Sequence, residues 1–371
     1  MDDVWQDNTL KLRSYGPVIL SFRQMPVSTT PLTTLALEDS LILPDLISHC
    51  KFPLPVSMVP YAKKVGSTSH SWLVRGGNLS IKKAKANLGL KGGLLTAMVY
   101  PDAPRHELRV CCDFLTYLFH LDNISDCMDD EGANHTADVV MNSLYLGRTY
   151  HTNSRVGKMT KDFWRRVTPT ATQGMQQRFM SNFDMYFQAV AVQAADRQAN
   201  ATPDLESYIT LRRDTSGCKP CWALIEFAYG LDIPDDVMEH SALRDLGEAA
   251  NDLVAWSNDI FSYSVEQSKD DKHNMVVIVM EAEGVSLQTA IDFVGTLCQS
   301  SIDRFNESKL LLPSFDGGNQ IDRDVARYIK GLEDWIVGSL HWSFETERYF
   351  GKHGKEVKRT RIVKLLPKRH H

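Results

Sequence analysis

From about residue 41 onward, apolar residues recur with the spacing of buried α-helices, and stretches that alternate between apolar and polar residues are scarce. Short segments rich in Pro, Gly and Ser separate the helical stretches. The longest predicted helices are residues 106–126, 170–198, 241–267, 287–308 and 323–349. Several carry apolar side chains on more than one side, which indicates that they pack against each other. The pattern therefore predicts one large all-α domain over residues 41–350.

The two ends of the chain differ from this helical region. Residues 1–40 are expected to form a partly irregular N-terminal segment. Residues 351–371 are strongly basic and contain one acid, Glu356. A basic tail can bind a membrane surface or a nucleic acid, but a solvated, loosely ordered end is more common. We expect the loosely ordered end.

The bulk composition limits the classes of function. The chain has 371 residues, of which 43% are hydrophobic and 23% charged, as in soluble globular proteins. Its net charge of −5 argues against a nucleic-acid partner. The best apolar run, residues 275–280, is far shorter than the ~20 residues of a membrane helix, so no stable membrane insertion is expected. Seven cysteines and a polar start without a signal peptide predict a cytosolic (cytoplasmic) protein with reduced thiols. The oligomeric state stays open, with a homodimer as one option.

A first candidate site lies in the predicted helix 241–267. Asn258, Ser262 and Glu266 are spaced by four residues, so their side chains follow one helix face and drift by about 40° per step. An amide oxygen, a hydroxyl and a carboxylate form an all-oxygen set, which suits a hard cation such as Mg²⁺. So sparse a set leaves coordination positions open for phosphate oxygens. The spacing alone also fits an ordinary polar helix face.

A second candidate site ends the predicted helix 106–126. Asp122 and Asp126 are one helical turn apart, and Leu115, Leu118 and Phe119 share the face of Asp122. An apolar stripe that ends in two carboxylates describes a pocket wall with acids at its mouth. A core face that ends at solvent is the alternative.

A third candidate site is the segment LRRDTSGCKP, in which Arg212 and Arg213 precede Ser216, Gly217 and Pro220. It reads as a helix that breaks inside the domain, which exposes unpaired backbone groups and lets an arginine face an anion. An ordinary helix end at a glycine fits the same residues.

A fourth candidate site is the pair Arg348-Tyr349, with Trp342 six residues before Arg348. Both residues of the pair can donate hydrogen bonds to phosphate oxygens. An aromatic face such as that of Trp342 stabilises a cation by ~2 kcal/mol or more where water is absent. Aromatic core packing is the alternative.

Together and in this order, the four motifs resemble those of class I terpene synthases, and most closely those of fungal, basidiomycete-type sesquiterpene synthases. The resemblance covers about residues 41–350. It implies a single-domain helical bundle around a deep apolar pocket. It further implies a Mg²⁺-dependent enzyme that ionises a prenyl diphosphate, farnesyl diphosphate first and geranyl diphosphate second, to a carbocation and diphosphate. The product would be a cyclic or acyclic terpene hydrocarbon or alcohol.

The resemblance also implies a metal site of three Mg²⁺ ions, for which Mn²⁺ can substitute. It assigns the bridging of two ions to Asp122, with Asp126 as a weaker ligand or an orienting residue. It assigns the third ion to Asn258, Ser262 and Glu266.

The remaining roles implied by the resemblance concern the substrate. Arg213 would be the diphosphate sensor, Ser216 a linker, and Gly217 the helix break with its carbonyl in the pocket. Arg348 and Tyr349 would close on the diphosphate. The pocket wall would consist of Leu115, Leu118, Phe119 and Trp342.

Two positions depart from the family pattern. Asn123 stands where the second acid of a DDxxD motif is usual, which matters little if Asp122 alone contacts the metal. Val265 stands where many relatives have a lysine, and Lys269, one turn later, is a candidate to supply the missing phosphate contact.

Two other functions fit a helical chain of this kind. A prenyl-chain elongating transferase shares the fold, but it normally carries two aspartate-rich motifs, and the stretch NDIFSYSVE at the second position argues against it. A non-catalytic helical binding protein would have little reason to keep all four motifs. The identity of the product is not predicted.

Overall fold

The structure is a computed structural model that describes residues 39–55 and 59–369. Regular structure in these residues is almost entirely α-helical, which confirms the predicted all-α fold. Residues from Ser40 onward form one compact unit, and the predicted irregular segment 1–40 lies almost wholly outside the described residues. The longer helices are α2 (Val59–Gly77), α5 (Arg105–Ser125), α6 (Asp130–Tyr145), α7 (Arg155–Val167), α8 (Gln173–Ala199), α12 (Ser241–Gln267), α14 (Leu287–Leu310) and α15 (Gln320–Glu345). The shorter elements are β1 (Ser40–Ile42), α1 (Leu46–His49), α3 (Ile81–Leu90), α4 (Gly92–Val99), η3 (Gly147–Thr149), α9 (Leu205–Thr215), α10 (Cys218–Tyr229), α11 (Asp235–Met238), α13 (Met275–Glu283), α16 (Glu347–Phe350), η4 (Gly351–His353), α17 (Gly354–Thr360) and β2 (Ile362–Lys364).

Local sequence fixes many of the helix ends. The hydroxyl of Thr172 accepts a hydrogen bond from the backbone N–H of Met175 at 3.2 Å and so begins α8. Asp204 begins α9 and Ser286 begins α14 in the same way. Such caps satisfy amides that the first helical turn leaves unpaired. Several helices end at residues in the left-handed conformation: Asn200, Gly230 and Gly284.

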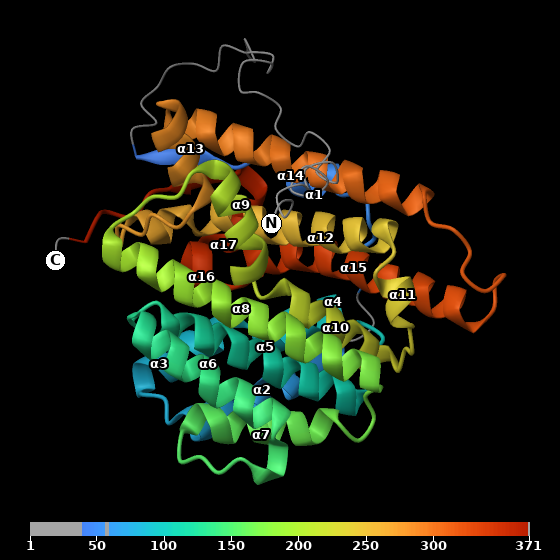
Figure 1. Cartoon of the computed structure of the whole chain (residues 1–371). Helices are drawn as coiled ribbons and strands as arrows, with labels where there is room; N and C mark the ends of the chain where they lie inside the picture. The colour runs from blue at the N-terminus through green and yellow to red at the C-terminus, as the bar shows by residue number, and fades with distance from the viewer. Residues whose placement is uncertain (1–38, 56–58, 370–371) are drawn as a thin grey trace, which may run out of the picture. The chain divides into compact units, whose positions relative to one another are not determined.

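Helix α12 lies at the centre of the fold and has the bounds predicted from the sequence. It packs against α14 and α15, which lie on either side of it (Figure 1). Leu246, Leu253 and Trp256 are buried on this helix, and each such side chain contributes roughly 1.5–3 kcal/mol on burial. This packing fixes the rotation of α12 and therefore the direction in which Asn258 points.

The prediction of one helix over residues 323–349 is wrong at its C-terminal end, because the structure has two helices there, α15 and α16. Thr346 is extended (φ −67°, ψ 149°), and its hydroxyl accepts a hydrogen bond from the backbone N–H of Arg348 at 3.2 Å. This cap ends α15 and begins α16. Arg348 and Tyr349 therefore lie on a short helix, α16, that is separate from α15.

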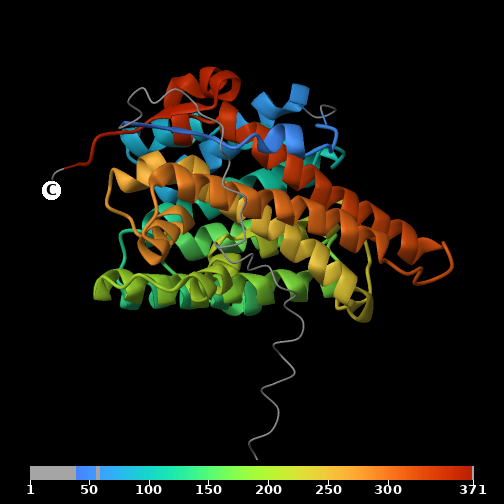
Figure 2. The same cartoon turned by 90° about the horizontal axis from the view of Figure 1, so that it is seen from above.

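The basic C-terminal tail is ordered as far as Arg369, contrary to the expectation of a loose end. Strand β2 pairs antiparallel with β1, and Leu41 lies opposite Val363; Figure 2 shows this C-terminal segment beside the first strand. The backbone N–H of Leu366 donates to the Ser264 hydroxyl at 3.0 Å. The tail thus runs over the C-terminal end of α12. Within the described part of the chain, every helix is too short or too polar to cross a membrane.

Candidate active site

Two connected chambers lie between the helices that carry the predicted motifs. The outer chamber has a volume of about 650 Å³ and the inner chamber about 160 Å³. Six residues line both chambers: Phe119, Asp126, Glu266, Asp271, Arg348 and Tyr349. Acidic and basic groups therefore concentrate where the two chambers meet.

The two predicted metal-binding motifs face this junction from different helices. On α5, Asp122 lines the inner chamber and Asp126 lines both. On α12, Asn258 lines the inner chamber, Ser262 the outer chamber and Glu266 both. The structure thus brings together oxygen-bearing side chains that are more than 130 residues apart in sequence, as counted from Asp122 to Asn258.

The state of these side chains fits a site for hard cations. The Ser262 hydroxyl oxygen is buried and has no hydrogen-bond partner among the described residues. The predicted ligands at the junction are carboxylate, amide and hydroxyl oxygens, which are the ligands that hard cations prefer. Within residues 39–55 and 59–369, no three His, Cys, Asp or Glu side chains form a group able to hold a metal alone. A metal site here is therefore expected to include Asn258, Ser262 and oxygens of a ligand.

Burial, and then neighbouring carboxylates, raise two pKa values at the junction. Burial raises the pKa of Glu266 to about 7, and the Asp259 carboxylate adds to the shift, while a hydrogen bond of 2.8 Å from Asn274 opposes it. Partial burial, with the Asp122 and Asp271 carboxylates, also raises the pKa of Asp126. Negative charge at this junction is therefore costly without a cation.

Arg212, and not Arg213, faces the chambers. Arg212 lines the inner chamber and donates to the Asn258 side-chain oxygen at 2.8 Å and to Asp259 at 3.0 Å. Burial opposes the charge of Arg212, but Asp259, Tyr208 and Glu266 together outweigh burial and raise the pKa of Arg212. The guanidinium therefore stays charged beside a predicted metal ligand.

The structure does not place Arg213 at the chambers, where the predicted role of diphosphate sensor would need it. Arg213 is buried and donates two hydrogen bonds of 2.7 Å to the Asp252 carboxylate. Arg304 of α14 pairs with the same carboxylate, and Glu248 lies 3.2 Å from Arg213. Arg213 therefore joins α9 to α12 and lines neither chamber. Two adjacent arginines on a helix point about 100° apart, and the sequence alone does not tell which one faces inward.

The helix break between α9 and α10 borders the inner chamber as predicted. Gly217 has φ +68°, and a side chain there would put its first carbon 2.8 Å from a methyl carbon of Leu118, so both backbone and space require glycine. The Ser216 hydroxyl accepts from the backbone N–H of Cys218 at 3.1 Å and donates to Asn251 at 2.8 Å. These bonds hold the break against α12.

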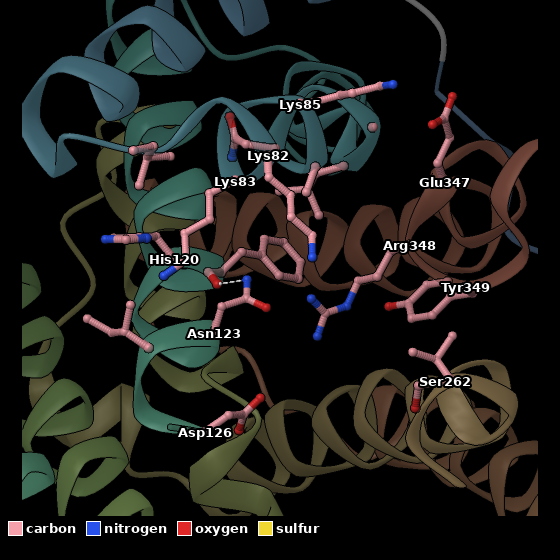
Figure 3. A pocket seen from close by; sticks show the side chains of 18 of the residues that line it. Lys82, Lys83, Lys85, His120, Asn123, Asp126, Ser262, Glu347, Arg348 and Tyr349 are labelled. Atoms are coloured by element: carbon pink, nitrogen blue, oxygen red, sulfur yellow. Dashed lines mark hydrogen bonds between the residues drawn. The ribbon is translucent and has the colours of Figure 1, made fainter. Parts of the chain in front are cut away.

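The adjacent residues Arg348 and Tyr349 connect the two metal-binding motifs. Arg348 donates to the Asp122 carboxylate at 3.2 Å. The Asn258 amide nitrogen donates to the Tyr349 hydroxyl at 2.6 Å. Burial opposes the charge of Arg348, yet Tyr349 and Asp122 raise its pKa. Helix α16 therefore spans the junction between α5 and α12 (Figure 3).

Apolar side chains form one wall of the inner chamber. Leu115, Leu118, Phe119 and Trp342 all line it, as predicted from the sequence. The ring centroids of Phe119 and Trp342 are 5.6 Å apart, and the Trp342 N–H donates to the Leu90 carbonyl at 3.0 Å. This hydrogen bond holds the Trp342 indole in its position at the wall of the inner chamber.

The sequence missed residues whose roles depend on tertiary contacts. Lys269 was predicted and does line the outer chamber, but Lys82 and Lys83 of α3, which line it too, were not. Tyr186 of α8 was also missed: it lines the inner chamber, and its buried hydroxyl has no partner among the described residues. Neither helix carries a motif that would have indicated these positions.

Comparison with known proteins shows the family to which the chain belongs. A family model described as "Terpene synthase family 2, C-terminal metal binding" matches residues 113–304, which include the C-terminal part of α5 and all of α9 and α12. Sesquiterpene synthase Agr1 of Cyclocybe aegerita is 61% identical over 88% of this chain and 94% of its own length. Sesquiterpene synthase 1 of Postia placenta is 57% identical over 92% of this chain and 99% of its own.

Solved structures share the fold at low sequence identity. The linalool/nerolidol synthase of Streptomyces clavuligerus in complex with 2-fluorogeranyl diphosphate superposes with a TM-score of 0.72. The two chains are 21% identical, and the match covers 81% of this chain and 99% of the other. At this identity the likeness concerns the helical architecture alone.

Proposed function

Because this chain belongs to the fungal class I sesquiterpene synthases, a metal-binding family of terpene synthases, we propose that it converts farnesyl diphosphate to a sesquiterpene at the junction of the two chambers. The supporting observation is the convergence of the α5 carboxylates and the α12 oxygens beside the inner chamber, one wall of which is apolar. The sesquiterpene synthases named above are similar over nearly their whole length, which supports the same substrate here. The cytosolic location, a homodimer and the use of geranyl diphosphate remain predictions.

The metal would be held by oxygens from both helices. We assign Asp122, with Asp126 in a weaker role, to two Mg²⁺ ions, and Asn258, Ser262 and Glu266 to a third, with Mn²⁺ as a substitute. The unpartnered Ser262 hydroxyl and the raised pKa of Glu266 support these assignments, because each marks a group that a cation would satisfy. Bound Mg²⁺ supplies Lewis-acid stabilisation of the departing diphosphate.

Three donors of this chain would bind the diphosphate group. Arg212 and Arg348 are charged and line the inner chamber, and Tyr349 adds a hydroxyl beside Arg348. Their present partners include Asn258 and Asp122, which are also proposed metal ligands, and Arg212 bonds to Asp259 as well. Arrival of the metal and the diphosphate would exchange these contacts, so that the donors turn to the phosphate oxygens as negative charge develops there.

The inner chamber would control the fate of the carbocation. Its apolar wall excludes water, which would otherwise quench the cation to an alcohol. Phe119 and Trp342 offer aromatic faces to a cation, and the Trp342–Leu90 hydrogen bond holds one of them in place. The shape of the wall would select the ring closure, because the bound conformation decides which double bond meets the cation.

Incubation of the purified protein with Mg²⁺ and geranyl, farnesyl or geranylgeranyl diphosphate tests the proposal, with volatile products identified by gas chromatography and mass spectrometry. We expect a sesquiterpene from farnesyl diphosphate. Addition of isopentenyl diphosphate distinguishes the alternative enzyme, because an elongating transferase would form a longer diphosphate instead. Absence of any Mg²⁺-dependent product would favour a non-catalytic binding protein.

A further inference from the structure

Most of the acids and most of the lysines that line the outer chamber lie on different walls. The carboxylates of Asp126, Glu266 and Asp271 lie on the side formed by α5, the end of α12 and the loop after it, where Lys269 also lies. A further acid, Glu347 of α16, lies beside Gly89 of α3. The opposite wall is α3, whose lysines 82, 83 and 85 all line the chamber. Position 265, beside the acid of α12, is a valine. Cations that face the acids across the chamber therefore come from α3 and from α16.

Lys82 and Lys83 are exposed, and no ion pair or side-chain hydrogen bond to another described residue occupies their ammonium groups. In Figure 3, Lys82 extends into the chamber on the side of Arg348, and Lys83 extends toward His120, whereas Lys85 extends away from them.

The position of α3 is fixed relative to Arg348. The Trp342 N–H donates to the Leu90 carbonyl at 3.0 Å, and the Thr346 hydroxyl donates to the Gly89 carbonyl at 3.3 Å. On the other side, His70 and Asn87 form a hydrogen bond of 2.8 Å. Because Thr346 also caps the helix that carries Arg348, the lysines and Arg348 lie on elements that are joined to each other.

We propose that Lys82 and Lys83 form a second anion-binding wall, which binds the phosphate end of an incoming prenyl diphosphate at the mouth of the site. This inference rests on the proposed function and adds residues that none of the four sequence motifs contains. The metal-binding acids approach the diphosphate from one side, and the lysines approach its oxygens from the other. Exposed lysines act in a high dielectric, so they increase capture of the substrate and contribute little to the ionisation step.

The test is steady-state kinetics of the double variant K82A/K83A with farnesyl diphosphate and Mg²⁺. We expect kcat/KM to fall by about three- to tenfold, kcat to change by less than about twofold, and the products to stay the same. The loss should shrink as ionic strength rises, because salt screens exposed charges. The variant K82R/K83R should recover most of the loss.

The matched control is K63A/K64A, which removes two adjacent exposed lysines from α2, outside both chambers. If the two double variants have the same kcat/KM, or if K82A/K83A loses kcat instead, the proposed wall is overturned. Calorimetric binding of inorganic diphosphate in the presence of Mg²⁺ gives a readout that does not need turnover. A wild-type protein that lacks turnover would refute the proposed function, whereas equal diphosphate affinity in wild type and K82A/K83A would refute the lysine wall alone.

Discussion

The guanidinium of Arg348 lies 3.2 Å from the carboxylate of Asp122, although the two residues are 226 positions apart in sequence. The next residue, Tyr349, accepts a hydrogen bond from Asn258 on α12. A four-residue helix thus contacts both proposed metal-binding motifs at once. If these motifs hold the metal as proposed, we expect the position of α16 to respond to metal binding.

Replacement of Asp122 by Ala should abolish turnover. Without this carboxylate, the α5 side has only the half-exposed Asp126 to hold a cation. We expect kcat to fall by at least about 10³-fold, since metal stabilisation of the leaving group supplies several kcal/mol. Asp130→Ala, in the exposed first turn of α6, is the control and should keep near-normal activity. Rates measured by diphosphate release check this, and an active D122A variant would contradict the assignment.

Arg212→Lys and Arg213→Lys should have opposite effects. Arg212→Lys removes the guanidinium beside Asn258, which should lower kcat by about 10²-fold with little change in the free energy of unfolding. Loss of the paired bonds from Arg213 to Asp252 should leave kcat nearly unchanged and lower the free energy of unfolding by roughly 1–3 kcal/mol. Kinetics and thermal unfolding of both variants check the reversal. A stable, inactive Arg213 variant would restore Arg213 as the sensor.

Trp342→Ala should change the products more than the rate of ionisation. The substitution enlarges the inner chamber next to Phe119 but leaves the residues that bind the metal and the diphosphate in place. Trp342→Phe retains an aromatic ring and loses the hydrogen bond to Leu90, so its product mixture should lie between those of wild type and Trp342→Ala. Product profiles by gas chromatography decide the point. Identical profiles in all three proteins would mean that Trp342 is core packing.

Asp334 on α15 should make stability depend on pH. Burial raises the pKa of Asp334 to about 6, although the neighbouring Lys330 opposes the shift. An acid with a raised pKa in the folded state contributes stability below its unfolded pKa and loses it as pH rises through the folded value. Relative to wild type, Asp334→Asn should therefore gain roughly 1–1.5 kcal/mol of unfolding free energy between pH 5 and pH 7.5. Urea unfolding at both values checks this, and a pH-independent difference would contradict it.

The sequence predicts the long helices and the metal-binding motifs because both depend on local spacing. Helix α12 begins and ends where its apolar period does, and Asn258, Ser262 and Glu266 follow one face of it. Asp122 likewise continues the apolar face of α5. These features need no knowledge of neighbouring helices.

The errors arise where tertiary contacts decide. Both Arg212 and Arg213 suit a helix of eleven residues, and only the carboxylates of Asp252 and Asp259 on α12 select which one turns inward. Strand β2 is only three residues long, and its pairing with β1 orders a basic tail that looks solvent-exposed in sequence. The lysines of α3 carry no motif, because their place at the chamber is set by contacts with α15 and α16.

The most direct test of the account is a Mg²⁺ titration of diphosphate release from farnesyl diphosphate by wild type and Glu266→Gln. The variant keeps the size of the side chain and an oxygen near Asn274, but it removes the charge proposed to hold a metal. The account predicts Mg²⁺-dependent release by wild type, and in the variant a lower maximal rate with a half-saturating Mg²⁺ concentration at least about tenfold higher. Superimposable titration curves for the two proteins would contradict it.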